Sequence, residues 1–172
     1  MSKRNLALAA GLFVLTLGLD WATKVLAEER LADSIVTVAP GWFWLKLAYN
    51  RGVAFSFLEG MPHWLLGSGA IVLLGVVVWS LRSLASTAMG AAALGMVVAG
   101  GLGNAVDRLL DGQVTDMIAV WKWPVFNVAD SAITVGVAML LLASRKGRAH
   151  AAQPAADMAL PRSDEDPPAV GP

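Results

Sequence analysis

The chain has 172 residues, of which 56% are hydrophobic and 15% are charged, with 13 basic and 13 acidic residues. The charged fraction is low for a soluble domain, and the balanced charge gives no indication of a nucleic-acid partner. The sequence contains no cysteine, which excludes a thiol nucleophile and a disulfide.

Four apolar runs are long enough to cross a bilayer, because about 20 residues of helix span its hydrocarbon core. They cover residues 6–26, 64–81, 87–106 and 128–144. We therefore expect an all-α integral membrane protein with four transmembrane helices. The first run follows basic residues, as in a cleavable signal peptide, but it is too long and merges into a polar edge at Asp20. We interpret it as an uncleaved anchor.

The segment between the first two helices, residues 31–59, differs in kind from the apolar runs. It is rich in Val, Phe, Trp and Thr, and Pro40-Gly41 is a turn signal beside the partly alternating "WFWLKLAY". This pattern predicts a small extracytoplasmic β-sheet of two or three strands, lying on the bilayer surface.

The third run carries a stripe of small residues at four-residue spacing, which favours close packing of helices in lipid. The stripe consists of Ala91, Gly95, Ala99 and Gly103. The end of the chain, residues 149–172, is rich in Ala, Pro and acidic residues and cannot build a core. We expect a four-helix membrane domain over residues 1–148 and a disordered cytoplasmic tail over residues 149–172.

The distribution of basic residues predicts the orientation. Short segments without acidic residues would lie in the cytoplasm together with both termini; they carry Lys3, Arg4, Arg82, Arg145, Lys146 and Arg148. Tryptophan favours the membrane interface, and all but Trp79 fall at the opposite ends of the runs. This topology places the polar residues that interrupt the runs near the outer face.

Two aspartates, Asp116 and Asp130, stand at the edges of apolar segments, where a carboxylate is costly and points to function. Asp130 has a structural alternative, since it could stabilise a helix N-terminus, as could Asn127. Asp116, on a loop that returns to the membrane, could be a solvated acid. Two close carboxylates in a poorly solvated site would share one proton, and could then activate water and protonate a leaving amine. This is the chemistry of aspartic proteases.

Other polar residues accompany these aspartates. Asp20 and Lys24 are four residues apart and share a helix face, either as a plain ion pair or as part of a site. Asn104 and Arg108 have the same spacing, and we interpret the neighbouring Asp107 as structural, either as the partner of Arg108 or as a helix-end charge. The sequence "YNRG" could be a tight turn or present its backbone to an extended substrate, and the lone His63 is interpreted as an ordinary interface residue.

Four blocks of the sequence carry a resemblance to a known family. They are "DWATK" at 20–24, "YNRGVAFS" at 49–56, "GGLGNAVDRLLDGQVTDMI" at 100–118 and "FNVADSAI" at 126–133. In order and spacing they resemble the lipoprotein signal peptidases, or signal peptidase II. Trp21 and Met117 depart from residues that are frequent in the family, but both are side positions.

The resemblance implies a membrane-embedded aspartyl endopeptidase of the bacterial inner membrane that cuts prolipoproteins before a diacylglyceryl-modified cysteine. It implies Asp116 and Asp130 as the catalytic dyad. The sequence itself shows no nucleotide-binding motif and no metal-ligand spacing, so we expect no cofactor or metal. The resemblance also implies contact with membrane lipid, inhibition by globomycin and an active site near the outer face, and we expect a monomer. The supporting polar residues that it implies are Asp20, Lys24, Asn50, Gly52, Asn104, Arg108 and Asn127.

Two other functions remain open at this point. The carboxylates could belong to a small transporter or a proton-relay protein, although they cluster at one face and leave no polar path to the other. Lys24 could instead serve a Ser-Lys protease, although no serine has a clear place beside it. Cleavage assays on alanine variants of each candidate residue separate the three hypotheses.

Overall fold

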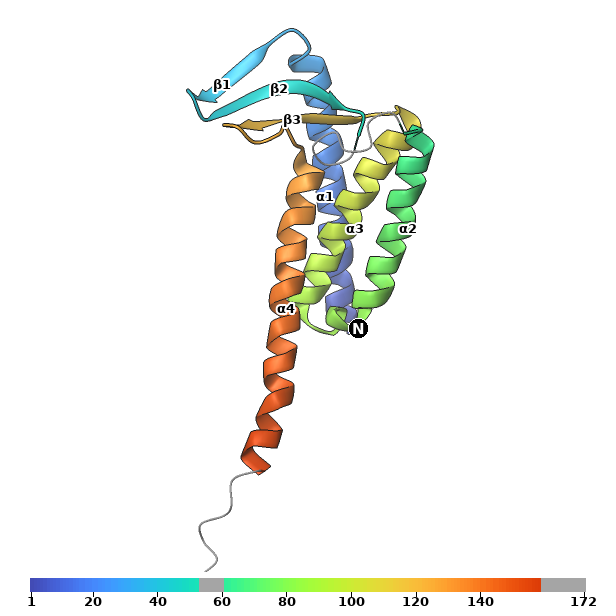
Figure 1. Ribbon diagram of the computed structural model, residues 1–172, viewed down its shortest axis with the longest axis vertical. Coiled ribbons are helices and arrows are strands. Elements are labelled where there is room, and N and C mark those ends of the chain that lie inside the picture. The colour runs from blue at the N-terminus through green and yellow to red at the C-terminus, as the bar shows by residue number, and fades with distance from the viewer. Residues whose placement is uncertain (53–60, 159–172) are drawn as a thin grey trace, which may run out of the picture.

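The computed structural model describes residues 1–52 and 61–158, with side chains described as far as residue 145. Four helices lie side by side, and a small sheet crosses one end of the bundle (Figure 1). In chain order the elements are α1 (Lys3–Arg30), β1 (Ile35–Ala39), β2 (Phe43–Asn50), α2 (His63–Leu81), the 3₁₀ helix η2 (Arg82–Ser86), α3 (Ala88–Leu110), β3 (Val114–Val120) and α4 (Val128–Met158).

Each of the four helices is long and apolar enough to cross a membrane, which confirms the four predicted runs. The central helix is α3, which contacts α1, α2 and α4. Most of α3 is buried, whereas the other three helices leave large apolar side chains on the surface of the bundle, as helices that face lipid do.

The small-residue stripe of α3 allows this close packing, as predicted. A Cβ atom added at Gly95 would lie 2.4 Å from the carbonyl oxygen of Ala9 on α1. Outside the stripe, a Cβ atom added at Gly100 would lie 2.5 Å from the carbonyl oxygen of Ala129 on α4. Helix backbones therefore approach α3 on two sides at distances that only glycine permits.

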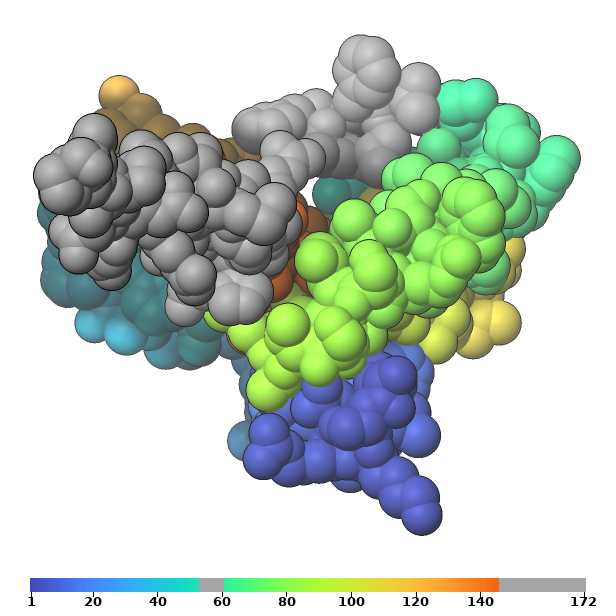
Figure 2. Space-filling view, turned by 90° about the horizontal axis from the view of Figure 1, so that it is seen from below, coloured from blue at the N-terminus to red at the C-terminus, as the bar shows by residue number. Residues whose placement is uncertain are grey.

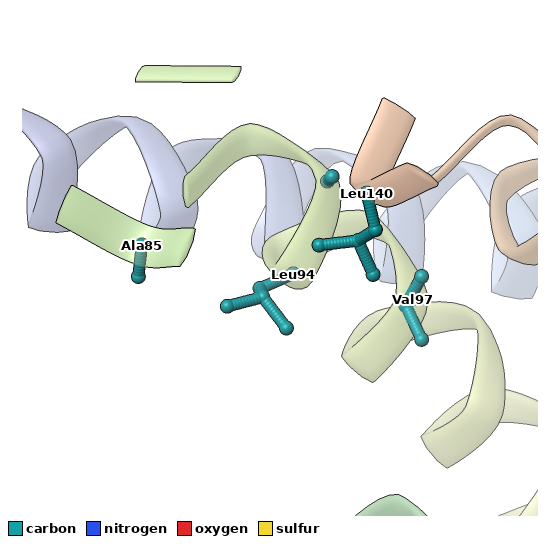
Figure 3. Close-up of a cluster of buried hydrophobic side chains, with 5 residues drawn as sticks. Ala85, Leu94, Val97 and Leu140 are labelled. Carbon is teal, nitrogen blue, oxygen red and sulfur yellow. The ribbon is translucent and has the colours of Figure 1, made fainter. Parts of the chain in front are cut away.

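Away from the sheet, an apolar cluster fills the space between α3, η2 and α4. It consists of Ala85, Ala93, Leu94, Val97 and Leu140 (Figure 3). At this end the buried Asn5 of α1 donates hydrogen bonds of 2.6 Å to the carbonyl oxygen of Ser86 and 3.3 Å to that of Ala85. Viewed from this end, the start of α1 (blue) lies against η2 and the start of α3 (lime green) (Figure 2). The amide of Asn5 thus fastens the first helix to the turn between α2 and α3.

The sheet has three antiparallel strands in the order β1-β2-β3. The predicted turn at Pro40-Gly41 joins β1 to β2, and Gly41 has a φ of 79°, which glycine adopts without strain. The third strand comes from between α3 and α4 and contains Asp116, opposite Ala48 of β2.

Two expectations about the sheet are corrected by this pairing. The sheet is not confined to the segment between the first two helices, and Asp116 lies on a strand rather than on a loop. The segment "VTDMIAV" is rich in residues that favour strands, but its partner β2 is more than 60 residues earlier in the sequence, and strand formation depends on that partner.

The fourth helix is longer than expected. It continues past residue 144 to Met158, and so covers the first part of the segment 149–172 for which we expected disorder. Alanine, the strongest helix former, is frequent in this stretch and favours the continuation, which Gly147 and Pro154 oppose. The rest of that segment, residues 159–172, and part of the predicted β segment, residues 53–60, lie outside the described residues.

Candidate active site

At the end of the bundle nearest the sheet, polar side chains from four elements meet. α1 supplies Asp20 and Lys24, α3 supplies Asn104, Asp107 and Arg108, β3 supplies Asp116, and α4 supplies Asp130 in its first turn, just after Asn127. Most of these side chains are buried, and Asn127 is completely so. Buried polar groups require partners, and here they find them largely in one another.

The start of α4 is stabilised by Asn127 and Asp130 together. The side-chain oxygen of Asn127 accepts a hydrogen bond of 2.8 Å from the backbone N–H of Asp130. In return, a carboxylate oxygen of Asp130 accepts one of 3.3 Å from the backbone N–H of Asn127. This reciprocal pattern is a capping box, so Asp130 does stabilise a helix N-terminus, as its structural alternative proposed.

The same Asn127 side chain also binds the second aspartate. Its Nδ2 donates a hydrogen bond of 2.7 Å to Oδ1 of Asp116. One buried amide therefore contacts both aspartates, through its oxygen on the backbone of Asp130 and through its nitrogen on the carboxylate of Asp116. The structure brings the two predicted aspartates together at this amide.

Asn104 provides a second link between the aspartates. Its Nδ2 donates a hydrogen bond of 2.8 Å to Oδ1 of Asp130. Its side-chain oxygen accepts two hydrogen bonds of 3.1 Å, one from Lys24 Nζ and one from Asn127 Nδ2. Each aspartate thus receives a hydrogen bond from a side-chain amide whose own oxygen is held by another donor.

The two aspartates differ in exposure. Asp116 is only 2% exposed, whereas Asp130 is partly accessible. Burial, and after it the negative charge of Asp130, raise the pKa of Asp116 from 3.8 to about 7, while the hydrogen bonds from Asn50 and Asn127 oppose the shift. Near neutral pH, Asp116 therefore exchanges a proton readily while it lies close to a second carboxyl group.

Lys24 lies between two carboxylates. Its Nζ is 2.6 Å from Oδ2 of Asp20 and 2.7 Å from Oδ2 of Asp107. The predicted pair of Asp20 and Lys24 is present, and Asp107 forms its ion pair with Lys24 rather than with Arg108, the partner that the sequence suggested. An ammonium held by two acids is not a free base, and in the described part of the chain no hydrogen bond joins Lys24 to a serine. The Ser-Lys alternative therefore finds no support.

Asp20 also connects the first helix to the last. Its Oδ1 accepts a hydrogen bond of 2.8 Å from the backbone N–H of Ala129, in the first turn of α4. The N–H groups of a first helical turn have no partner within the helix, so a carboxylate there stabilises the helix. The position of α4, and with it that of Asp130, is fixed by a residue of α1.

Arg108 contacts the turn that follows β2. Its guanidinium donates hydrogen bonds to the carbonyl oxygen of Gly52 at 2.9 Å and to that of Asn104 at 3.0 Å. The side-chain oxygen of Asn50 accepts a hydrogen bond of 3.0 Å from the N–H of Gly52, so the tight turn predicted for "YNRG" is confirmed. Arg108 binds a carbonyl group, but one of its own chain.

Sequence reasoning missed two contributors to this network. Asp107 was read as structural, and the Thr115 hydroxyl, which donates a hydrogen bond of 2.6 Å to Glu28 Oε1, was not considered. The position of Thr115 beside Asp116 was the only indication in the sequence. Glu28 resembles any exposed helix acid, so nothing in the sequence distinguished it.

The family described as Signal peptidase (SPase) II matches residues 12–146 of the chain. The chain belongs to the signal peptidase II family. It is 44% identical over 135 residues to the lipoprotein signal peptidase of Geobacter sulfurreducens, covering 73% of this chain and 83% of the relative. It is 41% identical over 137 residues to that of Chlorobium luteolum, covering 72% and 82%.

Two solved structures of bacterial membrane enzymes resemble the fold of this signal peptidase. The first has a TM-score of 0.69 at 22% identity and covers 95% of this chain and 94% of its own. The second has a TM-score of 0.65 at 24% identity and covers 78% and 90%. These likenesses support the arrangement of helices and sheet.

Membership in the family settles the class of reaction. The chain is a multi-pass bacterial membrane protein and an aspartic-type peptidase that acts on prolipoproteins. The transporter and proton-relay alternative is not favoured, because a family match across most of the chain names a peptidase.

Proposed function

We propose that Asp116 and Asp130 form the catalytic dyad of this signal peptidase, and that it cuts prolipoproteins before a diacylglyceryl-modified cysteine. The observation that carries the proposal is the Asn127 side chain, which binds the carboxylate of Asp116 and the backbone of Asp130 at once. A buried amide in this position holds two carboxyl groups at one place, where their ionisations influence each other.

The two carboxyl groups take different parts in hydrolysis. Asp130, the more accessible, accepts a proton from the attacking water as its oxygen forms a bond to the scissile carbonyl carbon. Asp116, whose pKa of about 7 leaves it protonated in half or more of the molecules at neutral pH and below, donates its proton as the carbon–nitrogen bond breaks and the amine leaves. Asp130 has then gained one proton and Asp116 has lost one, so the pair as a whole again holds a single proton.

The remaining polar residues hold this pair in place. Asn104 and Asn127 donate to the two carboxylates, and Asp20 fixes the start of α4. Arg108 holds the turn of Asn50 and Gly52 beside the site, through the carbonyl oxygen of Gly52. In this proposal the turn lines the path of an extended substrate segment.

Charge favours an orientation in which this end faces the outside of the cell. Among the residues whose side chains are described, Lys3, Arg4, Arg82 and Arg145 lie at the opposite end, in short segments that carry no acidic side chain. The basic residues at the site end, such as Arg30, Lys46 and Arg51, belong to much longer segments that also carry acidic side chains. By the positive-inside rule, both termini then lie in the cytoplasm of a cell whose inner membrane holds the enzyme, with the sheet outside.

The same proposal covers the partners of the enzyme. The lipid-modified cysteine of a prolipoprotein lies in the outer half of the bilayer, beside a site at the outer end of the helices. Inhibitors of the globomycin type would compete for this site. We also propose a monomer, and the contacts that join the named groups between four elements of one chain support it.

The test is cleavage of a synthetic diacylglyceryl prolipoprotein peptide by purified enzyme in detergent. Asp116→Asn and Asp130→Asn should each lose cleavage by at least about 10³-fold, because each removes one proton role of a dyad. The exposed Asp33 is the matched control, and Asp33→Asn should keep turnover. Near-normal turnover by either dyad variant, with the protein still folded, would refute the assignment.

A further inference from the structure

Asp107 is the acidic residue of the site to which hydrolysis gives no role. It contacts Lys24, whose ammonium carries three N–H donors. Three oxygens surround it: Asp20 Oδ2 at 2.6 Å and Asp107 Oδ2 at 2.7 Å, both as ion pairs, and Asn104 Oδ1 at 3.1 Å, as a hydrogen-bond acceptor. The side chain of Lys24 is only 7% exposed, so its ammonium group interacts with these three oxygens rather than with solvent.

This ammonium and the amide of Asn127 together determine which way the amide of Asn104 faces. The oxygen of Asn104 accepts from Lys24 and from Asn127, and the nitrogen is thereby left to donate to Asp130 at 2.8 Å. In the reverse orientation, the NH₂ group of Asn104 would face two other donors, and its oxygen would face a carboxylate. Only one orientation satisfies all four groups.

Asp107 holds the ammonium on the side of Asn104. Asp20 lies on the same helix as Lys24, so its attraction does not fix the position of the ammonium relative to α3. Asp107 and Asn104 are three residues apart on α3 and share a helix face, so the attraction of Asp107 keeps Nζ beside the oxygen of Asn104.

We propose that Asp107 and Lys24 are positioning residues for the dyad. Together they lock the amide of Asn104 in the orientation that donates a hydrogen bond to Asp130. This inference rests on the proposed function of Asp130. The Asp107–Lys24 pair affects turnover only through the hydrogen bond that Asn104 donates to Asp130. Neither residue contacts the reacting atoms.

The experiment is a double-variant cycle on turnover of the diacylglyceryl peptide. Asp107→Leu should lower kcat by about 10- to 100-fold, the range expected when a hydrogen bond to a charged group is lost. KM should stay within about twofold, because the substrate contacts are unchanged. In an Asn104→Leu background, Asp107→Leu should lower kcat by less than about twofold, since the group through which it acts is already gone.

Glu28→Leu provides the matched control. It also removes a carboxylate that joins two elements at this end, because Glu28 Oε1 accepts from the Thr115 hydroxyl, but it lies outside the contacts of Lys24. Its effect on kcat should be the same with and without Asn104, as for independent sites. Lys24→Arg keeps a charged donor and should retain more activity than Lys24→Gln.

Asp107→Asn is the alternative test variant if Asp107→Leu does not give folded protein. It keeps an acceptor without the charge, and should lower kcat by about 3- to 10-fold with the same dependence on Asn104. The inference is overturned if the Asp107 variants keep the kcat of the unmodified enzyme, or if their loss is equally large without Asn104. If either of these results is found while Asp116→Asn and Asp130→Asn are inactive, only the role of Asp107 is refuted and the dyad assignment stands. If the Asp116→Asn or Asp130→Asn variant is active, the proposed function itself is refuted.

Discussion

Replacing Asp116 by asparagine should change how the stability of the protein depends on pH. Burial, followed by the charge of Asp130, raises the pKa of Asp116 from 3.8 to about 7 in the folded protein. Between these two values the unfolded chain releases a proton that the folded protein keeps. The free energy of unfolding contributed by this group is therefore highest below about pH 4, falls as the pH rises to about 7, and is constant above that.

The size of the effect follows from the shift. Each pKa unit corresponds to about 1.4 kcal/mol, so a rise from 3.8 to about 7 corresponds to about 4 kcal/mol in full. Between pH 5 and pH 7, Asp116 should lower the free energy of unfolding by about 2 to 3 kcal/mol. For a chain of this length, that is a fall of roughly 5 to 10 °C in Tm. Asp116→Asn should lack this fall, because asparagine does not ionise.

The assay is thermal unfolding in detergent, followed by tryptophan fluorescence in steps from pH 4 to pH 9. The seven tryptophans provide the signal, and the exposed Asp33→Asn variant serves as the control with the unmodified pH dependence. Asp130→Asn should reduce the pH dependence without removing it, since burial is the larger cause of the shift. If Asp116→Asn shows the same fall in Tm between pH 5 and pH 7 as the unmodified protein, Asp116 does not hold a proton in the folded state.

Four further predictions follow from the site and the fold. Turnover against pH should be bell-shaped and should decline above about pH 7 as Asp116 loses its proton; a steady rise to pH 10 in a single-turnover assay would contradict a shared-proton pair. A reporter fused after Leu110 should be active only outside the cytoplasm and one fused after residue 146 only inside, and the opposite result would place the site at the cytoplasmic face. Strong chelators and thiol alkylators should leave activity unchanged, since the sequence has no cysteine and the described residues hold no group of three or more His, Asp or Glu that could bind a metal ion; activity lost on chelation and restored by zinc would refute the two-aspartate mechanism. Gly95→Ala should destabilise the protein by about 1 to 3 kcal/mol, because its Cβ would lie 2.4 Å from the carbonyl oxygen of Ala9, whereas Gly69→Ala, with nothing within 4 Å, should not; equal Tm values for the two variants would show that α1 yields at no cost.

The helices and the candidate residues could be predicted because each is marked locally. A run of apolar residues identifies a spanning helix by itself, and a carboxylate at the edge of such a run, such as Asp130, stands out from its neighbours. The turn at Asn50 to Gly52 was likewise visible, since its hydrogen bond joins residues two apart.

The parts that could not be predicted depend on partners far apart in the sequence. β3 is a strand because it pairs with β2, and a reading of "VTDMIAV" alone left Asp116 on a loop. Asp107 and Arg108 are adjacent in sequence, but adjacent residues on a helix point in different directions, so the contact of Asp107 with Lys24 on another helix had no local sign. The spacing of residues shows which side chains share one helix face, but not which faces meet.

The hydrogen bond from Ala129 to Asp20 has a consequence for how the enzyme comes into being. The first helix to leave the ribosome carries the group that holds the last one, and β3 and α4 follow only after three helices have been made. Before α4 is made, Asp20 lacks its partner Ala129, and its ion-pair partner Lys24 lies on its own helix. With Asp116 and Asp130 as the proposed dyad, a nascent chain with three inserted helices lacks Asp130, and it should be able to cut only when its own membrane insertion is complete.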